Sequence, residues 1–211
     1  MQSSTKIVFG HLIRWLLILL ACSIIYAALF SQSSIRVEKV AQRALDMMES
    51  PYAPISLKAK TGQGYELLLI VDHKHELQHQ LFVKRSLGLF WSFRGGGFGM
   101  KLDPQILLSF RMGMSTFGKY RHYYAVGQLN DPNISRVQIA WWDGYEQDAL
   151  MKDGVYLAGR SIRSSTKEQS ASRMNKVYAY DANGQLLYEL NDEQREIKAD
   201  AKSETEMKEA I

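Results

Sequence analysis

Residues 134–159 read ISRVQIAWWDGYEQDALMKDGVYLAG, and this stretch decides the fold class. Apolar and polar side chains alternate in its first half, which is the period-two pattern of a strand with one buried face. The apolar positions are Val137, Ile139 and Trp141. Asp143-Gly144 has the composition of a type I′ hairpin turn, and a second turn signal at residues 152–154 precedes the apolar VYLAG. The stretch therefore predicts a three-stranded antiparallel meander.

Similar strand and turn signals lie on both sides of this stretch. Alternating apolar residues begin at position 55, and residues 65–71, YELLLIV, have the composition of a buried strand. Near the other end of the chain, residues 181–184, DANG, predict another hairpin turn. We therefore expect an α+β, mostly β fold, in which residues 51–190 form an antiparallel β-meander domain after two N-terminal helices.

Residues 34–50, SIRVEKVAQRALDMMES, are typical of an amphipathic helix. Apolar side chains recur there at three- and four-residue spacing, with charged side chains between them. The prolines that follow are expected to end the helix, because the residue before a proline disfavours helical backbone. This juxtamembrane helix, assigned to residues 31–50, is expected to dock on the β domain. The alternative is a helix lying on a membrane surface, because its polar face is basic.

The chain carries no charge over residues 15–30, where it reads WLLILLACSIIYAALF. A helix of this length spans about 24 Å, and the apolar Leu12 and Ile13 extend it toward the roughly 30 Å of a bilayer core. We predict an uncleaved transmembrane signal-anchor here, after a short basic tail at residues 1–14. A cleaved signal peptide and a lipidated Cys22 are alternatives. However, no small-x-small cleavage site follows the apolar run, and the run continues well past Cys22.

This anchor determines the predicted location and partners. Lys6 and Arg14 precede it and further basic residues follow it, so the positive-inside comparison is close to a tie. The usual signal-anchor layout favours a single-pass protein of the cell membrane, with a cytoplasmic N-terminus and the domain outside. The expected partners are the lipid bilayer, through residues 15–30, and a membrane or cell-envelope protein. A formal net charge of +4 is too small to indicate nucleic acid.

The one enzyme-like motif is HELQH at residues 75–79, which matches H-E-x-x-H. In a zinc metallopeptidase this motif lies on a helix, where His75 and His79 bind zinc and Glu76 acts as general base. No third ligand follows at a suitable spacing, since the next glutamate is Glu146. The preferred alternative places the histidines in the connection between two strands, YELLLIV and QLFVKRS. We therefore predict no catalytic residue, metal or cofactor.

Residues 160–175, RSIRSSTKEQSASRMN, predict a solvated polar loop. Its basic side chains are the candidates for binding an anionic surface, and they are Arg160, Arg163, Lys167 and Arg173. The segment after the last predicted strand, residues 191–211, is dense in charge and poor in large apolar residues, and so predicts a flexible tail.

Two further patterns have simpler interpretations than a ligand site. The glycines of residues 94–99, RGGGFG, predict a turn and not a phosphate-binding loop, because no Lys-Ser or Lys-Thr pair follows them. A copper site would combine three methionines with a histidine, but methionines are far more often core residues. The side chains concerned are Met100, Met112, Met114 and His122.

Several of the strand-like stretches resemble a known kind of protein. They are ELLLIV with LFVKRSLGLFWSFRGGG, then ISRVQIAWWDGYEQDALMKDGVYLA and VYAYDANGQLLYEL. Over about residues 65–97 and 134–190, the chain is similar to small membrane-anchored extracytoplasmic proteins of Gram-positive, spore-forming bacteria. In that family a β-rich domain follows one N-terminal helix, and its function is uncharacterised. The resemblance implies strands around the histidines and implies no active residues.

The sequence as a whole favours a membrane-anchored protein without catalytic activity. Its expected role is to sense a ligand or a surface, or to serve as an accessory to a membrane complex. The alternative is a zinc metallopeptidase that uses the H-E-x-x-H at residues 75–79, with His75 and His79 as metal ligands.

Overall fold

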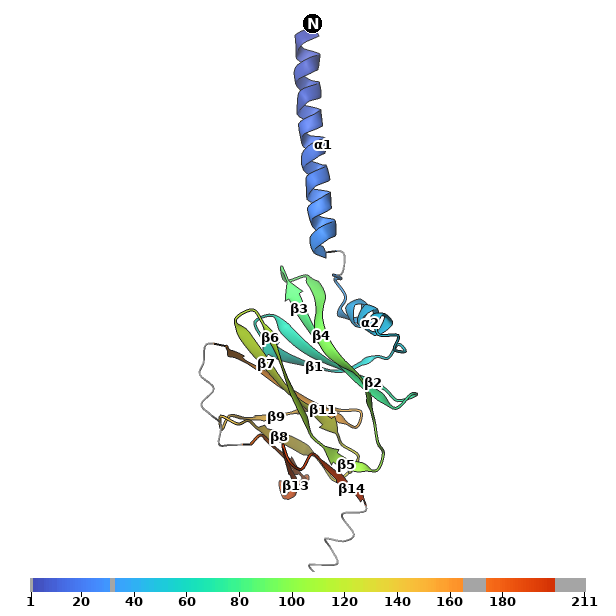
Figure 1. Ribbon diagram of the computed structural model, residues 1–211, viewed down its shortest axis with the longest axis vertical. Coiled ribbons are helices and arrows are strands. Elements are labelled where there is room, and N and C mark those ends of the chain that lie inside the picture. The colour runs from blue at the N-terminus through green and yellow to red at the C-terminus, as the bar shows by residue number, and fades with distance from the viewer. Residues whose placement is uncertain (1, 31–32, 165–173, 200–211) are drawn as a thin grey trace, which may run out of the picture.

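The computed structural model describes residues 2–30, 33–164 and 174–199, and in the first of these ranges the side chains of residues 11–26 only. In these ranges two helices precede a set of antiparallel strands (Figure 1). The predicted fold class is confirmed at this level: the protein is mostly β and antiparallel. Within the side chains that the structure describes, which in the first helix are those of residues 11–26, no helical stretch is long and apolar enough to cross a membrane.

The two helices have opposite relations to the β domain. Helix α1 (Gln2–Phe30) stands away from the domain (Figure 1). Its described side chains are all exposed. It begins at Gln2, so the predicted N-terminal tail is helical. Helix α2 (Val37–Met47) packs on the domain and buries five residues with the predicted spacing. They are Val37, Val40, Ala41, Ala44 and Leu45. Its apolar face is thus covered by protein, which favours the docked helix over the membrane-surface alternative.

The first sheet is a meander on which α2 packs. Its strands follow the sequence order: β1 (Ile55–Gly62), β2 (Tyr65–Asp72), β3 (Leu77–Ser86) and β4 (Phe90–Lys101). β2 and β3 are the central strands and are buried on both faces, which explains their nearly continuous apolar runs. Alternate residues of β3 divide between two cores. Leu81 packs with α2, whereas Phe82 packs with the second sheet.

The second and third sheets complete the domain. The second has the order β10-β11-β7-β6 and consists of β6 (Arg111–Phe117), β7 (Tyr120–Gln128), β10 (Leu150–Lys152) and β11 (Val155–Arg163). The third has the order β13-β12-β8-β9 and consists of β8 (Arg136–Ala140), β9 (Glu146–Asp148), β12 (Lys176–Tyr180) and β13 (Leu186–Asn191). A separate pair is formed by β5 (Ile106–Ser109) and β14 (Glu196–Lys198).

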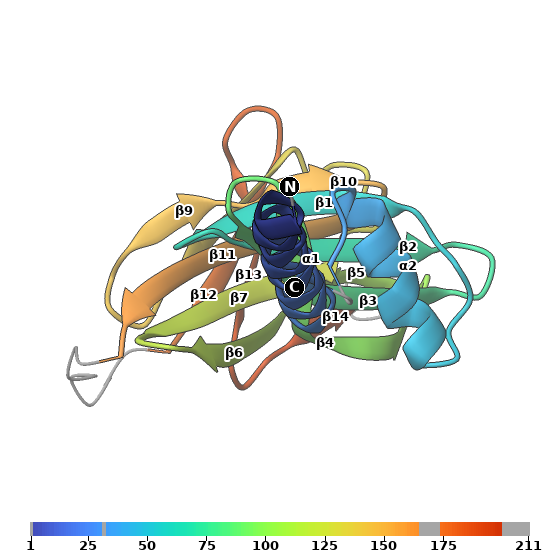
Figure 2. The ribbon, with the colours of Figure 1, turned by 90° about the horizontal axis from the view of Figure 1, so that it is seen from above.

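These elements lie in layers, with a separate apolar core between each pair of neighbours. The cores lie between α2 and the first sheet, between the first and second sheets, and between the second and third sheets. Trp141 and Tyr156 are the largest buried side chains and belong to the last of these cores. Figure 2, seen along α1, shows the strands extending beneath that helix to both sides, with α2 beside it.

The stretch at residues 134–159 departs from the predicted single meander. β8 and β9 pair in the third sheet, while β10 and β11 pair in the second. The chain changes sheet at Ala149, whose N–H donates to the carbonyl of Val137 at 2.8 Å. The first turn is also not type I′, because Gly144 has a positive φ of 83° and Asp143 does not. The alternating apolar residues of β8 all enter the core between the second and third sheets, whereas Val155 and Leu157 of β11 enter the core between the first and second sheets.

Two segments predicted as irregular contain strands. β11 continues to Arg163, so the start of the predicted polar loop at residues 160–175 is a paired strand. β14 lies inside the predicted flexible tail at residues 191–211 and pairs with β5, which extends the domain to Lys198. Residues 160–163 and β14 are rich in polar side chains and pair with segments distant in sequence, so their local composition alone does not indicate strands.

Candidate functional site

The H-E-x-x-H residues lie in the hairpin between β2 and β3. Asp72, the last residue of β2, holds the turn, because its Oδ1 accepts the N–H groups of Lys74 and His75 at 3.0 and 3.2 Å. Its Oδ2 lies 2.7 Å from His75 Nδ1. Burial opposes ionisation of Asp72, but the His75 imidazole and the backbone N–H groups outweigh it and lower the pKa of this carboxyl. The expected strand connection is therefore present.

The two histidines of the motif lie in different surroundings. The His75 side chain is 43% exposed in the turn, whereas His79 lies inside β3 with 0% exposure. The Nδ1 atom of His79 accepts the N–H of Gly99 on β4 at 3.1 Å, and burial lowers the pKa of its ring. The helix that a zinc peptidase needs is not formed here. In the part of the chain that the structure describes, no three His, Cys, Asp or Glu side chains are placed to hold a metal ion.

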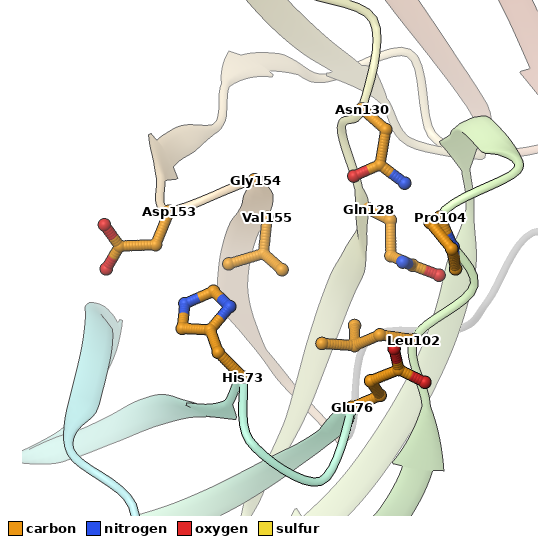
Figure 3. Close-up of a pocket in the computed structure, with 9 residues that line it drawn as sticks. All are labelled: His73, Glu76, Leu102, Pro104, Gln128, Asn130, Asp153, Gly154 and Val155. Atoms are coloured by element: carbon orange, nitrogen blue, oxygen red, sulfur yellow. The ribbon is translucent and has the colours of Figure 1, made fainter.

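The β2–β3 turn closes a pocket at one end of the first two sheets (Figure 3). The cavity volume is about 210 Å³. Segments far apart in the sequence meet around it: the β2–β3 turn, the β4–β5 link, the end of β7 and the β10–β11 turn. The lining residues are His73, Glu76, Leu102, Pro104, Gln128, Asn130, Asp153, Gly154 and Val155.

The base of this pocket is held by side-chain amides. Gln128 accepts the N–H of Asp103 at 3.2 Å and donates to the Asp103 carbonyl at 3.3 Å. Asn130 Nδ2 donates to the carbonyls of Asp103 and Ile106 at 3.1 and 2.7 Å. These bonds fasten the β4–β5 link to the end of β7. Together with the buried Val155 they give the pocket a fixed, partly apolar base.

The rim of the pocket is exposed and carries acceptor groups. Glu76 and Asp153 supply carboxylates, and His73 supplies an imidazole. Figure 3 shows Asp153 and His73 on one side of the pocket and Glu76 on the other, beside Leu102. Both acidic residues adopt left-handed backbone with φ of 54°, which L residues with side chains rarely do. Lys152 Nζ lies 3.6 Å from Asp153 Oδ2, and no lysine or arginine is among the lining residues.

Of the basic candidates of residues 160–175, the structure describes Arg160 and Arg163, and these two lie in different surroundings. Arg160 lies within β11 and its side chain is only 17% exposed. Its two terminal nitrogens donate to the carboxylate of Asp143, each at 2.8 Å, and its guanidinium lies 4.5 Å from the Tyr145 ring. Arg160 therefore fastens the β8–β9 hairpin to the second sheet. Arg163 is exposed at the end of β11, and Lys167 and Arg173 lie outside the described residues.

The glycine-rich stretch at residues 94–99 lies in β4 and is not a turn. A Cβ atom on Gly96 would collide with the backbone carbonyl of Gln80, so the absence of a side chain allows β3 and β4 to approach closely. This explains the glycine without a phosphate. The prediction of a turn at residues 94–99 was wrong, because the local sequence does not show the neighbouring strand.

The methionines and the histidine of the copper alternative are not brought together. Met112 packs in the core between the second and third sheets. His122 lies on the other face of the second sheet, where its Nδ1 is 3.1 Å from Thr61 Oγ1 and its ring is 4.5 Å from the Tyr65 ring. The ring is fully buried, and this burial lowers the pKa of His122. Its contacts are those of a core histidine.

The pocket is not predictable from the sequence, because its walls come from turns whose proximity no periodic pattern reveals. The available signal was a carboxylate at each of two turns, Glu76 before β3 and Asp153 before Gly154. The chain matches no protein-family model, no curated protein and no solved structure. The side chains themselves and their arrangement are therefore the basis for a functional assignment.

Proposed function

We propose that this chain is a membrane-anchored binding protein without catalytic activity, whose β domain offers a small-ligand pocket away from the anchor. The observation that carries the proposal is the exposure of the apolar side chains of α1. Its large apolar residues between Leu12 and Tyr26 are 45% to 66% exposed, on all sides of the helix. A helix that is apolar all round needs an apolar environment, such as a bilayer.

The sequence of α1 supports the same role. Its uncharged run from residue 15 to Phe30 corresponds to about 24 Å of helix, and Leu12 and Ile13 lengthen its apolar part. Arg14 has a stem long enough to carry its charge to the headgroups. We further propose a single-pass topology at the cell membrane, with the N-terminus cytoplasmic and the domain outside.

The pocket beside the β2–β3 turn supports a binding role. Its base is fixed by hydrogen bonds, so a ligand would not have to order it, which favours affinity. Its volume of about 210 Å³ fits a small molecule. The carboxylates of Glu76 and Asp153 accept hydrogen bonds and favour positive charge. The ligand class proposed is a small amine or another compound rich in hydrogen-bond donors.

Membrane anchorage is tested on the full chain, expressed in a bacterial host. We expect it to stay in the membrane pellet after an alkaline carbonate wash. A double variant, Leu17→Arg with Leu20→Arg, should be released, because each arginine in mid-span costs about 2.5 to 3.5 kcal/mol. The control, Leu150→Arg with Leu186→Arg, changes exposed domain residues and should remain in the pellet. Release of the unaltered chain would overturn the anchor.

The side of the membrane is tested with protease added to intact cells stripped of their wall. An outside domain should be digested, while complete protection would reverse the proposed orientation.

The binding role is tested by thermal shift of the detergent-solubilised full chain with small amines, including ethanolamine, putrescine and arginine. At least one should stabilise the protein, and Glu76→Gln with Asp153→Asn should abolish that shift. Glu193→Gln, at an exposed acid outside the pocket, is the matched control and should retain it. If none of these amines stabilises the protein, the proposed ligand class is wrong.

The metallopeptidase alternative is tested by measuring bound zinc. One equivalent of zinc that survives dialysis of the unaltered chain, and is lost in the His75→Ala with His79→Ala variant, would favour the metallopeptidase.

A further inference from the structure

The β3–β4 hairpin ends in an exposed apolar tip, which points toward the base of α1 (Figure 1). Leu87 is 77% exposed and Leu89 is 58% exposed. Gly88 lies between them, so three successive residues at the tip have no charge and no hydrogen-bonding side chain. Leucines this exposed contribute little to any core of the domain, so their presence at the tip needs another explanation.

The backbone conformation at the tip is one that leucine rarely adopts. Leu87 has a φ of 52° and Gly88 a φ of 69°. Two successive residues with positive φ are the geometry of hairpin turns that favour Asn-Gly, since asparagine tolerates the left-handed region and larger side chains do not. The chain therefore keeps an exposed leucine where folding alone favours asparagine or glycine.

The tip is tethered close to the end of α1. Ser34 forms two backbone hydrogen bonds with Trp91 on β4, at 2.9 and 2.7 Å. The chain from Phe30 to Ser34 reaches at most about 14 Å, and Trp91 is two residues from Leu89. In addition, the ring of Tyr26 lies 6.4 Å from that of Phe90. If α1 crosses a bilayer, the contact between Tyr26 and Phe90 brings the tip to the headgroup layer, which is roughly 5 to 8 Å thick on each side.

Within residues 84–94, all charged side chains are basic. They are Lys84, Arg85 and Arg94. Arg36, two residues beyond Ser34, is also exposed, and the nearby acid Glu38 is paired with Lys58 at 3.0 Å. The guanidinium of Arg85 lies 5.4 Å from the Trp91 ring. Apolar tips flanked by aromatic and basic side chains are typical of segments that enter the interface of an anionic membrane.

We propose that the tip Leu87–Leu89 inserts into the interface of an anionic lipid bilayer, and that Arg36, Lys84 and Arg85 contact lipid phosphates. This inference rests on the proposed anchorage by α1. It adds a second point of contact, which fixes the domain's orientation, because a single helix would leave the domain free to rotate about its link. β3 then leads away from the bilayer, and the pocket at its other end faces the aqueous side.

The test places an environment-sensitive fluorophore, NBD, on the full chain in a Cys22→Ser background. The protein is reconstituted into vesicles of phosphatidylglycerol and phosphatidylcholine, with some lipid spin-labelled near the headgroup. NBD on Leu87→Cys should shift its emission to the blue and be quenched by the spin label. The matched control is Asp153→Cys, another exposed turn residue with positive φ, at the pocket end. It should show neither effect.

A third position, Leu20→Cys, separates this inference from the anchorage on which it rests. Shielding at residue 20 without quenching at residue 87 would overturn the membrane-inserted tip and leave the anchor intact. No shielding at either position would overturn both. Equal quenching at residues 87 and 153 would also contradict the inference, because it would indicate a domain without fixed orientation. In vesicles of phosphatidylcholine alone, quenching at residue 87 should decrease, because the basic side chains then lose their anionic partners.

Discussion

The two ends of β3 differ in chemistry although one strand joins them. At its start, the turn after β2 carries Glu76 and borders a pocket with a second carboxylate, Asp153. At its end, the turn before β4 carries exposed leucines between basic side chains. A strand of this length separates the two turns by about 33 Å. The comparison indicates a domain that is polarised along its strands, with a proposed membrane end and a proposed ligand end.

At each end of β3, an exposed turn residue has a strained backbone conformation. Glu76 has a φ of 54° and Leu87 a φ of 52°, at the two turns that β3 connects. Between them, Leu81, Phe82 and Val83 are at most 1% exposed and belong to two cores. Strained residues with side chains cluster at functional turns when the surrounding structure can hold them. Here the buried middle of β3 supplies that support to both ends.

The largest expected effect follows from removing that shared support. Phe82→Ala should lower the free energy of unfolding by about 3 to 5 kcal/mol, because truncating a buried phenylalanine leaves a cavity. Phe82 packs edge-on against Phe117 and Tyr124 across the first two sheets. Chemical denaturation of the detergent-solubilised chain measures the loss. Leu186→Ala, at a residue 46% exposed, is the control and should change stability by less than about 0.5 kcal/mol. A comparably small loss for Phe82→Ala would contradict the role of β3 as common support.

The next largest effect is the dependence of stability on pH, to which two buried histidines contribute. Burial lowers the pKa of His79, near the pocket end, and of His122, which packs against Phe82 from the second sheet. Below the ordinary histidine pKa of 6.5, the unfolded chain binds protons that the folded chain excludes. The contribution of each buried histidine to the free energy of unfolding is therefore fully present above that pH. On acidification below it, the free energy of unfolding should fall by about 1.4 kcal/mol per pH unit for each histidine, until the pH reaches the pKa of that histidine in the folded chain.

Denaturation midpoints between pH 7.5 and 5 measure this dependence. The negative charge of Asp72 opposes the lowering at His79, and no such carboxylate contributes at His122. His122→Asn should therefore flatten the pH dependence more than His79→Asn does. The reverse order would show that the pocket end contains the more strongly shielded histidine.

A smaller effect on stability is expected for the arginines of β11, and it distinguishes a structural arginine from an exposed one. Arg160→Gln should cost roughly 1 to 2 kcal/mol, because it removes a bidentate ion pair with Asp143 and a contact with the Tyr145 ring. Arg163→Gln, on the same strand but exposed, should stay within about 0.5 kcal/mol. Denaturation of both variants under the same conditions gives the comparison. Equal effects would mean that Arg160 belongs to the exposed basic surface after all.

The sequence predicted most of the local structure of the domain. A period-two apolar pattern located β8, a continuous apolar run located β2, and helical spacing located α2 with its buried residues. It did not predict which strands become neighbours. The alternation at residues 134–159 is the same whether β10 pairs with β9 or, as found, with β11 alone. The glycine-rich sequence around Gly96 is typical of a turn, and only the adjacent backbone of Gln80 explains why a strand has glycine at this position. Such outcomes depend on contacts between distant segments, which local patterns do not encode.

The candidate site was less predictable than the fold. The histidines of the H-E-x-x-H gave a definite hypothesis, and the hairpin that surrounds them was the preferred alternative. The pocket beside them needed Asp153 and Asn130, which lie far along the chain and carry no motif. The apolar tip was visible in the sequence as SLGLF, but only its exposure and its backbone conformation distinguish it from core.

The smallest expected change in stability is the one that tests the comparison between the ends most directly. Leu87→Asn should raise the free energy of unfolding by about 0.5 to 1 kcal/mol, because asparagine adopts positive φ with less strain than leucine. The leucine gives up little packing in the folded domain, since it is 77% exposed. The same substitution should weaken membrane contact. NBD on Leu89→Cys should therefore be quenched less in the Leu87→Asn variant than in the chain that keeps Leu87.

Glu76→Asn is the counterpart at the other end of β3. Its residue has nearly the same φ, so stability should rise by a similar amount, while quenching at residue 89 should not change. Denaturation midpoints and quenching are measured on the same preparations. If Leu87→Asn destabilises the protein, the leucine contributes packing that its exposure does not reveal. If both variants gain stability and both keep full quenching, strain is present at the two turns but the leucine at the tip serves no membrane contact. A gain in stability coupled to a loss of quenching at the tip alone is the result that would show the leucine is kept for the membrane at the expense of the fold.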